Sequence, residues 1–264
     1  MLRITDLCKS FNVGTINEKK VLDHLDLTLE EGDFVTVIGG NGAGKSTLLN
    51  MIAGVYLSDC GTITLEGKDV TRLPEHARAK FLGRVFQDPM KGTAANMQIQ
   101  ENLALAYRRG KKRGLRWGIT EEEKKIYQES LKQLELGLEE RMTSKVGLLS
   151  GGQRQAITLL MATLKKPKLL LLDEHTAALD PKTAAKVLDL TKQIVEKNNL
   201  TAVMVTHNMK DAIQIGNRLI MMHNGKIIYD VRGEEKEALK VADLLQKFEQ
   251  ATGGEFANDR MILA

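Results

Sequence analysis

Hydrophobic residues in this chain fall mostly in short runs, and their spacing changes from one part of the chain to the next. Many runs are four to nine residues long, rich in Val, Ile and Leu, and bounded by Gly, Asn or Asp, a pattern typical of β-strands. Such runs predict strands over Leu2–Leu7, Val21–Leu29, Phe34–Ile38, Thr62–Leu65, Gly83–Phe86, Leu169–Leu172, Thr201–Val205, Arg218–Met222 and Lys226–Tyr229.

Helical spacing follows several of these strands. It predicts helices over Lys45–Ala53, Lys182–Glu196 and Met209–Ile215. Strands that alternate with helices favour an α/β fold whose parallel sheet is covered on both faces.

The pattern changes between residues 90 and 145, where strand signals give way to helical ones. We predict helices over Ile99–Arg109 and Thr120–Leu134, and Thr120 with Glu123 forms a capping box for the second. A last helix is predicted over Glu234–Gln250, with an apolar stripe made by Ala238, Val241, Ala242, Leu245 and Phe248. We therefore expect one domain over 1–264: an α/β core of residues 1–89 and 146–233, a helical subdomain over 90–145, and a C-terminal helix and tail over 234–264.

The composition and the N-terminal sequence indicate where in the cell the chain is located. No apolar run reaches the roughly 18–20 residues that span a bilayer, and the N-terminus lacks the basic and apolar regions of a secretory signal. Cys8 and Cys60 have no metal-like spacing, which argues against a disulfide framework and favours a packing role. We expect a cytoplasmic chain.

A basic cluster lies around Gly110, made of Arg108, Arg109, Lys111, Lys112, Arg113 and Arg116. Three interpretations are open: a solvated loop, contact with anionic lipid headgroups at about 1 kcal/mol per charge, or nucleic-acid binding. The last is the weakest, since Trp117 is the one aromatic residue among these charges.

A glycine-rich segment follows the strand predicted over Phe34–Ile38 and precedes a predicted helix. It reads Gly39-Gly40-Asn41-Gly42-Ala43-Gly44-Lys45-Ser46-Thr47 and fits the phosphate-binding pattern G-x-x-x-x-G-K-[ST]. Glycines let backbone N–H groups surround the phosphates of ATP, and the helix presents its positive end to the same anion. We expect Lys45 to bridge the β- and γ-phosphates, Ser46 to bind Mg²⁺ and Thr47 to bond a phosphate oxygen.

Two carboxylates end the apolar strand Leu169–Leu172. In a phosphate site the first acid, Asp173, is placed to hold Mg²⁺. The second, Glu174, is placed to orient and deprotonate the attacking water, which makes it the candidate general base.

A second glycine motif, Leu149-Ser150-Gly151-Gly152-Gln153, precedes that strand. Its serine hydroxyl and glycine N–H groups at a helix start form a second anion site in the same chain. The segment resembles the signature of the ATP-binding-cassette (ABC) family. The resemblance implies a RecA-like P-loop NTPase core with an antiparallel β subdomain and an inserted helical subdomain. It also implies a head-to-tail dimer in which the signature of one subunit closes over the ATP of the other.

Other positions match the family one by one. Gln87 matches the glutamine that touches Mg²⁺ and the attacking water, and His207 matches the histidine that contacts the γ-phosphate. Asp180 matches the loop that communicates across the dimer. Phe11 stands where the family has an aromatic ring stacked on adenine, although a core phenylalanine is the competing interpretation.

The chain also departs from the common family pattern. His175 replaces a frequent proline, Ala177 a frequent serine and Ala156 a frequent arginine. With the segments from Lys91 and Arg108, the run after the signature resembles a bacterial subgroup linked to uptake of aromatic amino acids such as tryptophan or tyrosine.

The resemblance implies an ATPase subunit that drives a separate membrane permease, held at the cytoplasmic face of the membrane, with an extracellular substrate-binding lipoprotein as a further partner. The competing functions are a single-cassette ATPase of an assembly scaffold, such as iron–sulfur cluster assembly, a translation factor, and a small-molecule kinase. A single cassette counts against the translation factor. The signature, together with Glu174 beside Asp173, counts against the kinase.

Overall fold

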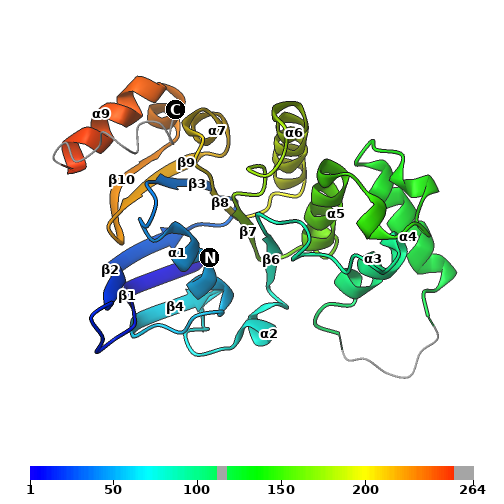
Figure 1. The fold of residues 1–264 in the computed structure, drawn as a ribbon, viewed down its shortest axis with the longest axis horizontal. Coiled ribbons are helices and arrows are strands. Elements are labelled where there is room, and N and C mark those ends of the chain that lie inside the picture. Colours follow the sequence, from blue (N-terminus) through cyan, green and yellow to red (C-terminus); the bar gives the residue numbers. More distant parts are fainter. Residues whose placement is uncertain (112–117, 253–264) are drawn as a thin grey trace. The chain divides into compact units, whose positions relative to one another are not determined.

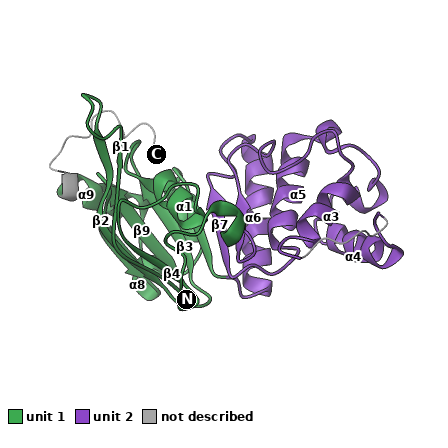
Figure 2. Cartoon of the chain, turned by 90° about the horizontal axis from the view of Figure 1, so that it is seen from below, with its two compact units in different colours: residues 1–78, 201–264 green, residues 79–200 purple. Residues whose placement is uncertain are grey.

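The computed structural model describes residues 1–111 and 118–252, which form helices and two sheets of strands (Figure 1). The chain divides into two compact units (Figure 2). Unit 1 comprises Met1–Arg78 and the C-terminal part from Thr201, and unit 2 comprises Ala79–Leu200. Each unit is described by itself below.

Unit 1 contains an antiparallel sheet with the strand order β2-β1-β4-β5. Its strands are β1 (Leu2–Phe11), β2 (Lys19–Leu29), β4 (Cys60–Leu65) and β5 (Lys68–Asp69). Leu2 pairs with Leu29 on one side and Leu65 on the other, and all three side chains are buried. The predicted N-terminal strands are thus present, and β1 extends four residues further, to Phe11.

A second group of strands in unit 1 has the order β10-β9-β3-β8. The central strand β3 (Phe34–Gly39) runs parallel to β8 (Ala202–Val205) and to β9 (Arg218–His223), whereas β10 (Lys226–Arg232) is antiparallel to β9. Every residue of β3 is buried, as a continuous apolar run predicts. Helices α1 (Lys45–Ala53) and α7 (Met209–Gln214) pack against β3.

The C-terminal helix differs from the prediction. The segment forms two helices, α8 (Glu234–Glu237) and α9 (Val241–Thr252). Val241, Leu245 and Phe248 of the predicted stripe pack against the core together with the buried Leu244, whereas Ala238 and Ala242 are exposed. The buried Lys236 ammonium donates to three carbonyl oxygens at the end of α7, at 2.6–3.0 Å. These hydrogen bonds anchor α8 to the end of α7.

Unit 2 pairs two parallel strands, β6 (Leu82–Val85) and β7 (Leu169–Asp173). Its helices are α3 (Ile99–Tyr107), α4 (Glu121–Lys132), α5 (Gly151–Thr163) and α6 (Pro181–Lys197). A buried apolar cluster joins α3, α4 and α5, and includes Leu103, Tyr127 and Ile157. The predicted capping box of α4 is confirmed, because Thr120 and Glu123 exchange side chain-to-backbone hydrogen bonds at 3.2 and 3.0 Å. The division into an α/β core and a 90–145 subdomain stays a prediction.

The prediction that the two cysteines are separate packing residues was wrong. Cys8 of β1 and Cys60 of β4 form a disulfide, with their Cα atoms 5.0 Å apart. The antiparallel register places the two residues directly opposite each other. Residues 52 positions apart carry no local signal of such a pairing.

Part of the basic cluster is accounted for by contacts within unit 2. Arg108 binds Glu123, with its Nη2 atom 2.7 Å from the carboxylate, and Arg109 donates to the carbonyl oxygens of Ala162 and Lys165 at 3.3 and 3.2 Å. Lys112, Arg113, Arg116 and Trp117 lie outside the described residues. Among the described helices, none combines the length and apolarity that a membrane span needs.

Candidate functional site

The glycine-rich loop joins β3 to α1, as predicted. Its glycines Gly39, Gly42 and Gly44 have φ values of 151°, 78° and 100°, which L-residues with a side chain rarely adopt. Gly44 is the N-cap of α1, and a residue without a side chain cannot cap the helix itself. The N-terminus of α1 thus has no side-chain cap from its N-cap residue, and helix N-termini of this kind bind anions.

Close packing also requires glycine in this loop. A Cβ atom on Gly39 would lie 2.2 Å from the Met222 carbonyl oxygen, and one on Gly44 would lie 2.8 Å from the Leu22 side chain. The loop is therefore packed against β9 and β2, and among residues 39–45 only Asn41 and Gly42 are exposed. Such a bare, turned backbone before a helix fits a phosphate chain.

Lys45 is buried at the first position of α1. Its ammonium group donates to the carbonyl oxygens of Gly39 and Gly40, at 2.6 and 3.1 Å. The loop thus holds a positive charge over its own backbone, where it would meet a bound phosphate. Ser46 and Thr47 follow in the same turn.

His207 lies near this loop in the strand order of unit 1. It comes two residues after β8, which is parallel to β3 and pairs Val205 with Val37. Because adjacent parallel strands end at the same edge of a sheet, His207 and the loop that begins at Gly39 share that edge. The Thr206 N–H donates to the Val37 carbonyl oxygen at 3.2 Å and fixes the turn that carries the histidine.

Phe11 ends β1 and is only partly buried. Its ring meets Tyr56 edge to face at 5.2 Å between centroids. The backbone partner of Phe11 in β2 is Lys19, whose Nζ atom lies 3.4 Å from the position of a Cβ atom on Gly42. A cation thus stands beside the phosphate loop, and Phe11 is the strand partner of the residue that carries it.

Sequence reasoning missed two parts of this arrangement. The first is Lys19, which lies outside the strand predicted over Val21–Leu29 and was assigned no role. The second is Gly225, in the turn between β9 and β10, whose N–H donates to the Ala43 carbonyl oxygen at 3.1 Å. The dipeptide Asn224-Gly225 between two predicted strands is a hairpin signal that would have located this turn, though not its contact with the loop.

In unit 2, the paired acids stand at the end of β7, as predicted. An Asp173 carboxylate oxygen lies 3.7 Å from Nη2 of Arg84 on the neighbouring strand β6. Glu174 has a φ of 46°, in the left-handed region that is uncommon for residues other than glycine. The backbone therefore turns sharply at the candidate general base.

His175 anchors the segment after this turn. It is 2% exposed, and its Nε2 atom lies 2.9 Å from the Thr191 hydroxyl oxygen of α6. The Thr191 hydroxyl itself donates to the Val187 carbonyl oxygen at 2.8 Å, so His175 must be the donor in the first bond. Burial lowers the pKa of His175 to about 4 and keeps the ring neutral. A proline at this position would lack that link to α6.

Gln87 follows β6 and is exposed. The residue before it is held by α5, because the buried Gln155 side chain donates to the Phe86 carbonyl oxygen at 3.2 Å. Sequence reasoning missed Gln155, which lies two residues after the signature and looks like any polar residue of a helix. It ties the Gln87 segment to the helix that the signature begins.

The signature starts α5 with a reciprocal capping box. The Gln153 N–H donates to the Ser150 hydroxyl at 3.3 Å, and the Ser150 N–H donates to the Gln153 side chain at 3.1 Å. A Cβ atom on Gly152 would lie 2.1 Å from Cγ2 of Thr183, so this glycine lets α5 approach α6. Gly151 is exposed, whereas Ala156 is 1% exposed and lies within the core cluster, so an arginine there would be buried.

Asp180 is the N-cap of α6. Its carboxylate accepts a hydrogen bond from the Thr183 N–H at 3.1 Å. Hydrogen bonds from Thr183 lower the pKa of Asp180. The neighbouring Ala177 is exposed, and its N–H donates to the Glu174 carbonyl oxygen at 3.0 Å.

The predicted residues thus fall into two sets, one in each unit. Unit 1 gathers the phosphate loop with Phe11 and His207, and unit 2 contains Gln87, the two acids, the signature and Asp180. That the acids and Gln87 act on the phosphates of unit 1 stays a prediction.

The phosphate loop, parallel strands and helices define a P-loop α/β ATPase. Residues 22–177 match the family described as ABC transporter. The chain is 46% identical, over 95% of its length and 100% of the relative, to a tyrosine transport ATP-binding protein of Clostridioides difficile. It is 34% identical to the xylose/arabinose import ATP-binding protein XylG of Sulfolobus acidocaldarius, over 94% of each chain.

A solved structure agrees with these relatives. The ATP-binding cassette MJ0796, a dimer in a post-hydrolysis state bound to ADP and Pi, superposes with a TM-score of 0.75 at 30% identity. The alignment covers 88% of this chain and 98% of that one. The chain therefore belongs to the ABC transporter family, as the ATP-binding subunit that hydrolyses ATP.

Proposed function

We propose that two copies of this chain close head to tail around two molecules of Mg·ATP and drive a membrane permease that imports an amino acid of the aromatic class. The observation that carries the proposal is the presence of two separate anion-binding helix starts in one chain, α1 with its phosphate loop and α5 with its signature. A subunit that served only its own ATP would need one. The dimer described for MJ0796 supports this pairing.

Each predicted residue has a role in this proposal. Lys45 and the N–H groups from Asn41 to Thr47 bind the phosphates, Phe11 stacks on adenine, and His207 contacts the γ-phosphate. Glu174 accepts a proton from the attacking water. Ser150 and the N–H groups of Gly151, Gly152 and Gln153 bind the γ-phosphate of the other subunit's ATP, and Asp180 contacts that subunit.

The candidate ligands for Mg²⁺ are Ser46, Gln87 and Asp173. A hydroxyl, an amide oxygen and a carboxylate suit this ion, which prefers oxygen ligands and keeps several waters. Bound Mg²⁺ would neutralise charge on the phosphate oxygens. In unit 2, Arg84 stands beside Asp173 and compensates its negative charge.

A hollow in the surface of unit 2 supports docking of a permease after Gln87. Phe86, Lys91, Leu105 and Met161 are among the residues that line it. Apolar side chains are exposed there: Leu105 is 42% exposed, and the nearby Met90 is 44% exposed. A permease segment with apolar and acidic side chains would cover this surface and hold the chain at the cytoplasmic face of the membrane.

The substrate class rests on the relatives. A tyrosine transport protein and a sugar import protein both support uptake, and the more similar of the two favours an aromatic amino acid. A substrate-binding lipoprotein is the expected outer partner of such an importer. Co-purification with mild detergent, followed by identification of the attached membrane chains, tests both partners.

The reaction itself is tested with Glu174→Gln. Without its general base the variant should bind ATP as tightly as the natural chain, lose at least about 100-fold in turnover, and accumulate an ATP-bound dimer in size-exclusion chromatography with light scattering. Glu196→Gln, at an exposed position near the end of α6, is the matched control and should hydrolyse ATP normally. Hydrolysis by Glu174→Gln at the control's rate would remove the assigned role.

Head-to-tail closure is tested by adding Ser150→Arg to Glu174→Gln. The arginine should leave ATP binding by single subunits unchanged and prevent the ATP-dependent dimer, because it obstructs the second anion site. Thr143→Arg places the same side chain at an exposed position of unit 2 and should leave the dimer intact. A dimer that persists with Ser150→Arg would contradict the trans arrangement.

A further inference from the structure

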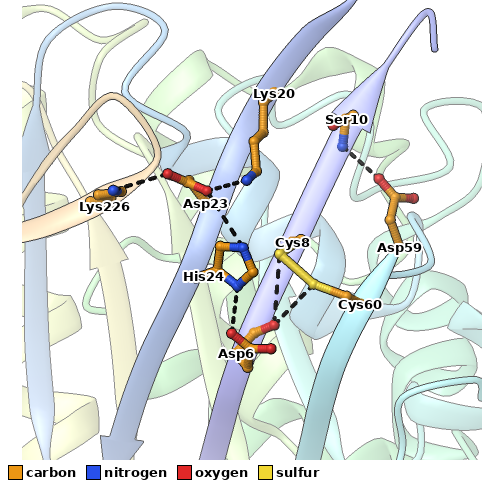
Figure 3. A network of polar contacts seen from close by, with 9 residues as sticks. All are labelled: Asp6, Cys8, Ser10, Lys20, Asp23, His24, Asp59, Cys60 and Lys226. Carbon is orange, nitrogen blue, oxygen red and sulfur yellow. Dashed lines mark hydrogen bonds and ion pairs between the residues drawn. A yellow bond between two sulfur atoms is a disulfide. The ribbon is translucent and has the colours of Figure 1, made fainter. Parts of the chain in front are cut away.

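The only two cysteines of the chain meet a histidine on the antiparallel sheet of unit 1 (Figure 3). Cys8 comes from β1, Cys60 from β4 and His24 from β2, so three strands contribute one residue each. One ligand atom from each of the three lies within 4.8 Å of the other two. Cys8 is buried, Cys60 is half-buried and His24 is exposed, so the cluster reaches solvent on its histidine side.

Irregular backbone in or beside all three strands brings the side chains of Cys8, Cys60 and His24 together. Asp6, His24 and Gly61 have φ values of 55°, 51° and 78°, and the β1 register shifts against both neighbours beside them. A Cβ atom on Gly61 would lie 2.2 Å from the Asp6 carbonyl oxygen, so glycine is needed for this approach. Bulges of this kind turn side chains away from their regular alternation.

The side chains have the chemistry of a thiophilic metal site. Two thiolates and an imidazole are the preferred ligands of Zn²⁺, and ligand atoms around one tetrahedral Zn²⁺ lie roughly 3.3–3.8 Å apart. To reach that spacing, the two sulfur atoms must separate once the disulfide is reduced, and the histidine nitrogen, which lies within 4.8 Å of them, must keep or slightly shorten its distance. Asp6 Oδ1 lies 2.6 Å from His24 Nδ1, which leaves Nε2 to coordinate an ion. Zinc-bound histidines commonly have a carboxylate partner of this type.

The surrounding charges also favour a cation. Asp6 and Asp26 lie next to each other, because the Asp6 N–H donates to the Asp26 carboxylate at 2.9 Å. Asp23 lies on the other side of His24, 3.9 Å from its Nε2 atom, and pairs with Lys20 and with Lys226. The positive charges of the two lysines are thus paired with the Asp23 carboxylate. The Asp6 carboxylate bonds to His24.

We propose that the reduced chain binds one Zn²⁺ through Cys8, Cys60 and His24, with water as a fourth ligand, and that the disulfide is the alternative state without metal. The two states exclude each other because the disulfide occupies both sulfur atoms. A dithiol reductant links them. One of its thiolates attacks a cysteine sulfur and breaks the S–S bond, its second thiol resolves the mixed disulfide, and two cysteine thiols and one oxidised dithiol result. Binding of Zn²⁺ then releases the two thiol protons.

The site also fixes the segment that leads to Phe11. Asp59 precedes Cys60, and its carboxylate binds the Lys9 ammonium at 2.7 Å and the Ser10 N–H at 2.6 Å. Metal and disulfide therefore both hold β1 to β4 just before the aromatic ring. The proposal does not depend on what that ring binds.

The experiment uses the full chain reduced with a dithiol, freed of metal, and titrated with Zn²⁺ against a chromophoric chelator. We expect one Zn²⁺ per chain, and Co²⁺ in its place should give a thiolate-to-metal charge-transfer band. The same chain oxidised with a glutathione disulfide buffer should bind at least tenfold more weakly. This comparison needs no substitution, so misfolding of a variant cannot imitate its result.

Variants identify the ligands. Cys8→Ser with Cys60→Ser should abolish the Co²⁺ band, and His24→Asn should weaken Zn²⁺ binding at least tenfold while asparagine still tolerates the left-handed backbone. His76→Asn, at an exposed histidine of α2 (Glu75–Arg78), is the matched control and should bind like the natural chain. Equal Zn²⁺ binding by the reduced natural chain and the double serine variant would overturn the proposal. A loss confined to the serine variant, with His24→Asn unaffected, would overturn the role of His24.

Discussion

The two helix starts of this chain use the same backbone chemistry in opposite ways. At α1 in unit 1, the N-cap is Gly44, which provides no side-chain cap, and the Lys45 ammonium donates to the loop carbonyl oxygens. At α5 in unit 2, Ser150 and Gln153 already cap each other's N–H groups. The N-terminus of α1 is therefore suited to bind an anion directly. At the N-terminus of α5, an anion would first have to replace the hydrogen bonds between Ser150 and Gln153.

Their glycines differ in the same way. Three glycines of the phosphate loop have positive φ values and shape a curved backbone. Gly152 of the signature is helical and instead removes a side chain that would collide with Thr183 of α6. The phosphate loop therefore uses its glycines for backbone conformation, whereas the signature uses Gly152 for packing. This contrast fits a loop that binds ATP alone and a signature that binds only when a second ATP arrives.

The largest effect is expected from removing the positive charge of Lys45 in the phosphate loop. Lys45→Met should lower ATP hydrolysis by at least about 100-fold, because the positive charge at the phosphates is lost. Lys145→Met removes an exposed lysine of unit 2 and should leave the rate within about twofold. Near-normal steady-state hydrolysis by Lys45→Met would show that the loop backbone alone is sufficient.

Acid is expected to act on unit 2 through His175. Its pKa of about 4 lies below the 6.5 of an unperturbed histidine, so the unfolded chain takes up this proton first as the pH falls. The free energy of unfolding should therefore fall between pH 6.5 and pH 4, by roughly 3 kcal/mol in total, and be unaffected by this group above that window. In denaturant titrations, the free energy of unfolding of His175→Gln should lack this part of the dependence on pH. A pH profile identical to that of the natural chain would contradict the role of His175.

The packing glycine is expected to give an intermediate effect. Gly152→Ala should lower the free energy of unfolding by about 1–3 kcal/mol, since the added methyl group meets Thr183. Gly151→Ala is the matched control: its Cβ atom would lie 3.4 Å from the Leu179 side chain, an ordinary contact. Urea unfolding should rank the two variants in that order, and the reverse order would refute the packing role.

The smallest effect is expected at Lys19, the cation beside the phosphate loop. Lys19→Met should raise the KM for ATP two- to fivefold at low salt, corresponding to about 0.5–1 kcal/mol for an exposed charge, with the difference shrinking as salt rises. Lys20→Met changes the adjacent lysine, whose ammonium pairs with Asp23, and should alter KM less. Equal KM values for the two variants would place the Lys19 contact outside nucleotide binding.

Local signals predicted most of the fold and of the candidate site. The phosphate loop, the acids after β7, the signature and the capping boxes each lie within a few residues, where side-chain type and backbone conformation are directly coupled. The predicted helices of unit 2 are found with their ends shifted by at most a few residues. Family resemblance added Gln87 and His207, which composition alone presents as ordinary polar residues at strand ends.

Other features arise only when distant segments pack together. The antiparallel register of β1 and β4 decides that Cys8 faces Cys60, and packing of α5 brings Gln155 to the carbonyl group before Gln87. The position of α8 likewise depends on Lys236, whose three carbonyl partners lie more than 19 residues away.

The sequence by itself thus determined the chemistry of this protein, because each catalytic motif is a short stretch with its own backbone geometry. The tertiary structure decided which residues support that chemistry: the hairpin glycine behind the phosphate loop, the lysine beside it, the histidine that anchors the turn after Glu174, and the cluster of Cys8, Cys60 and His24. Their contacts join residues far apart in the chain, so no short pattern contains them.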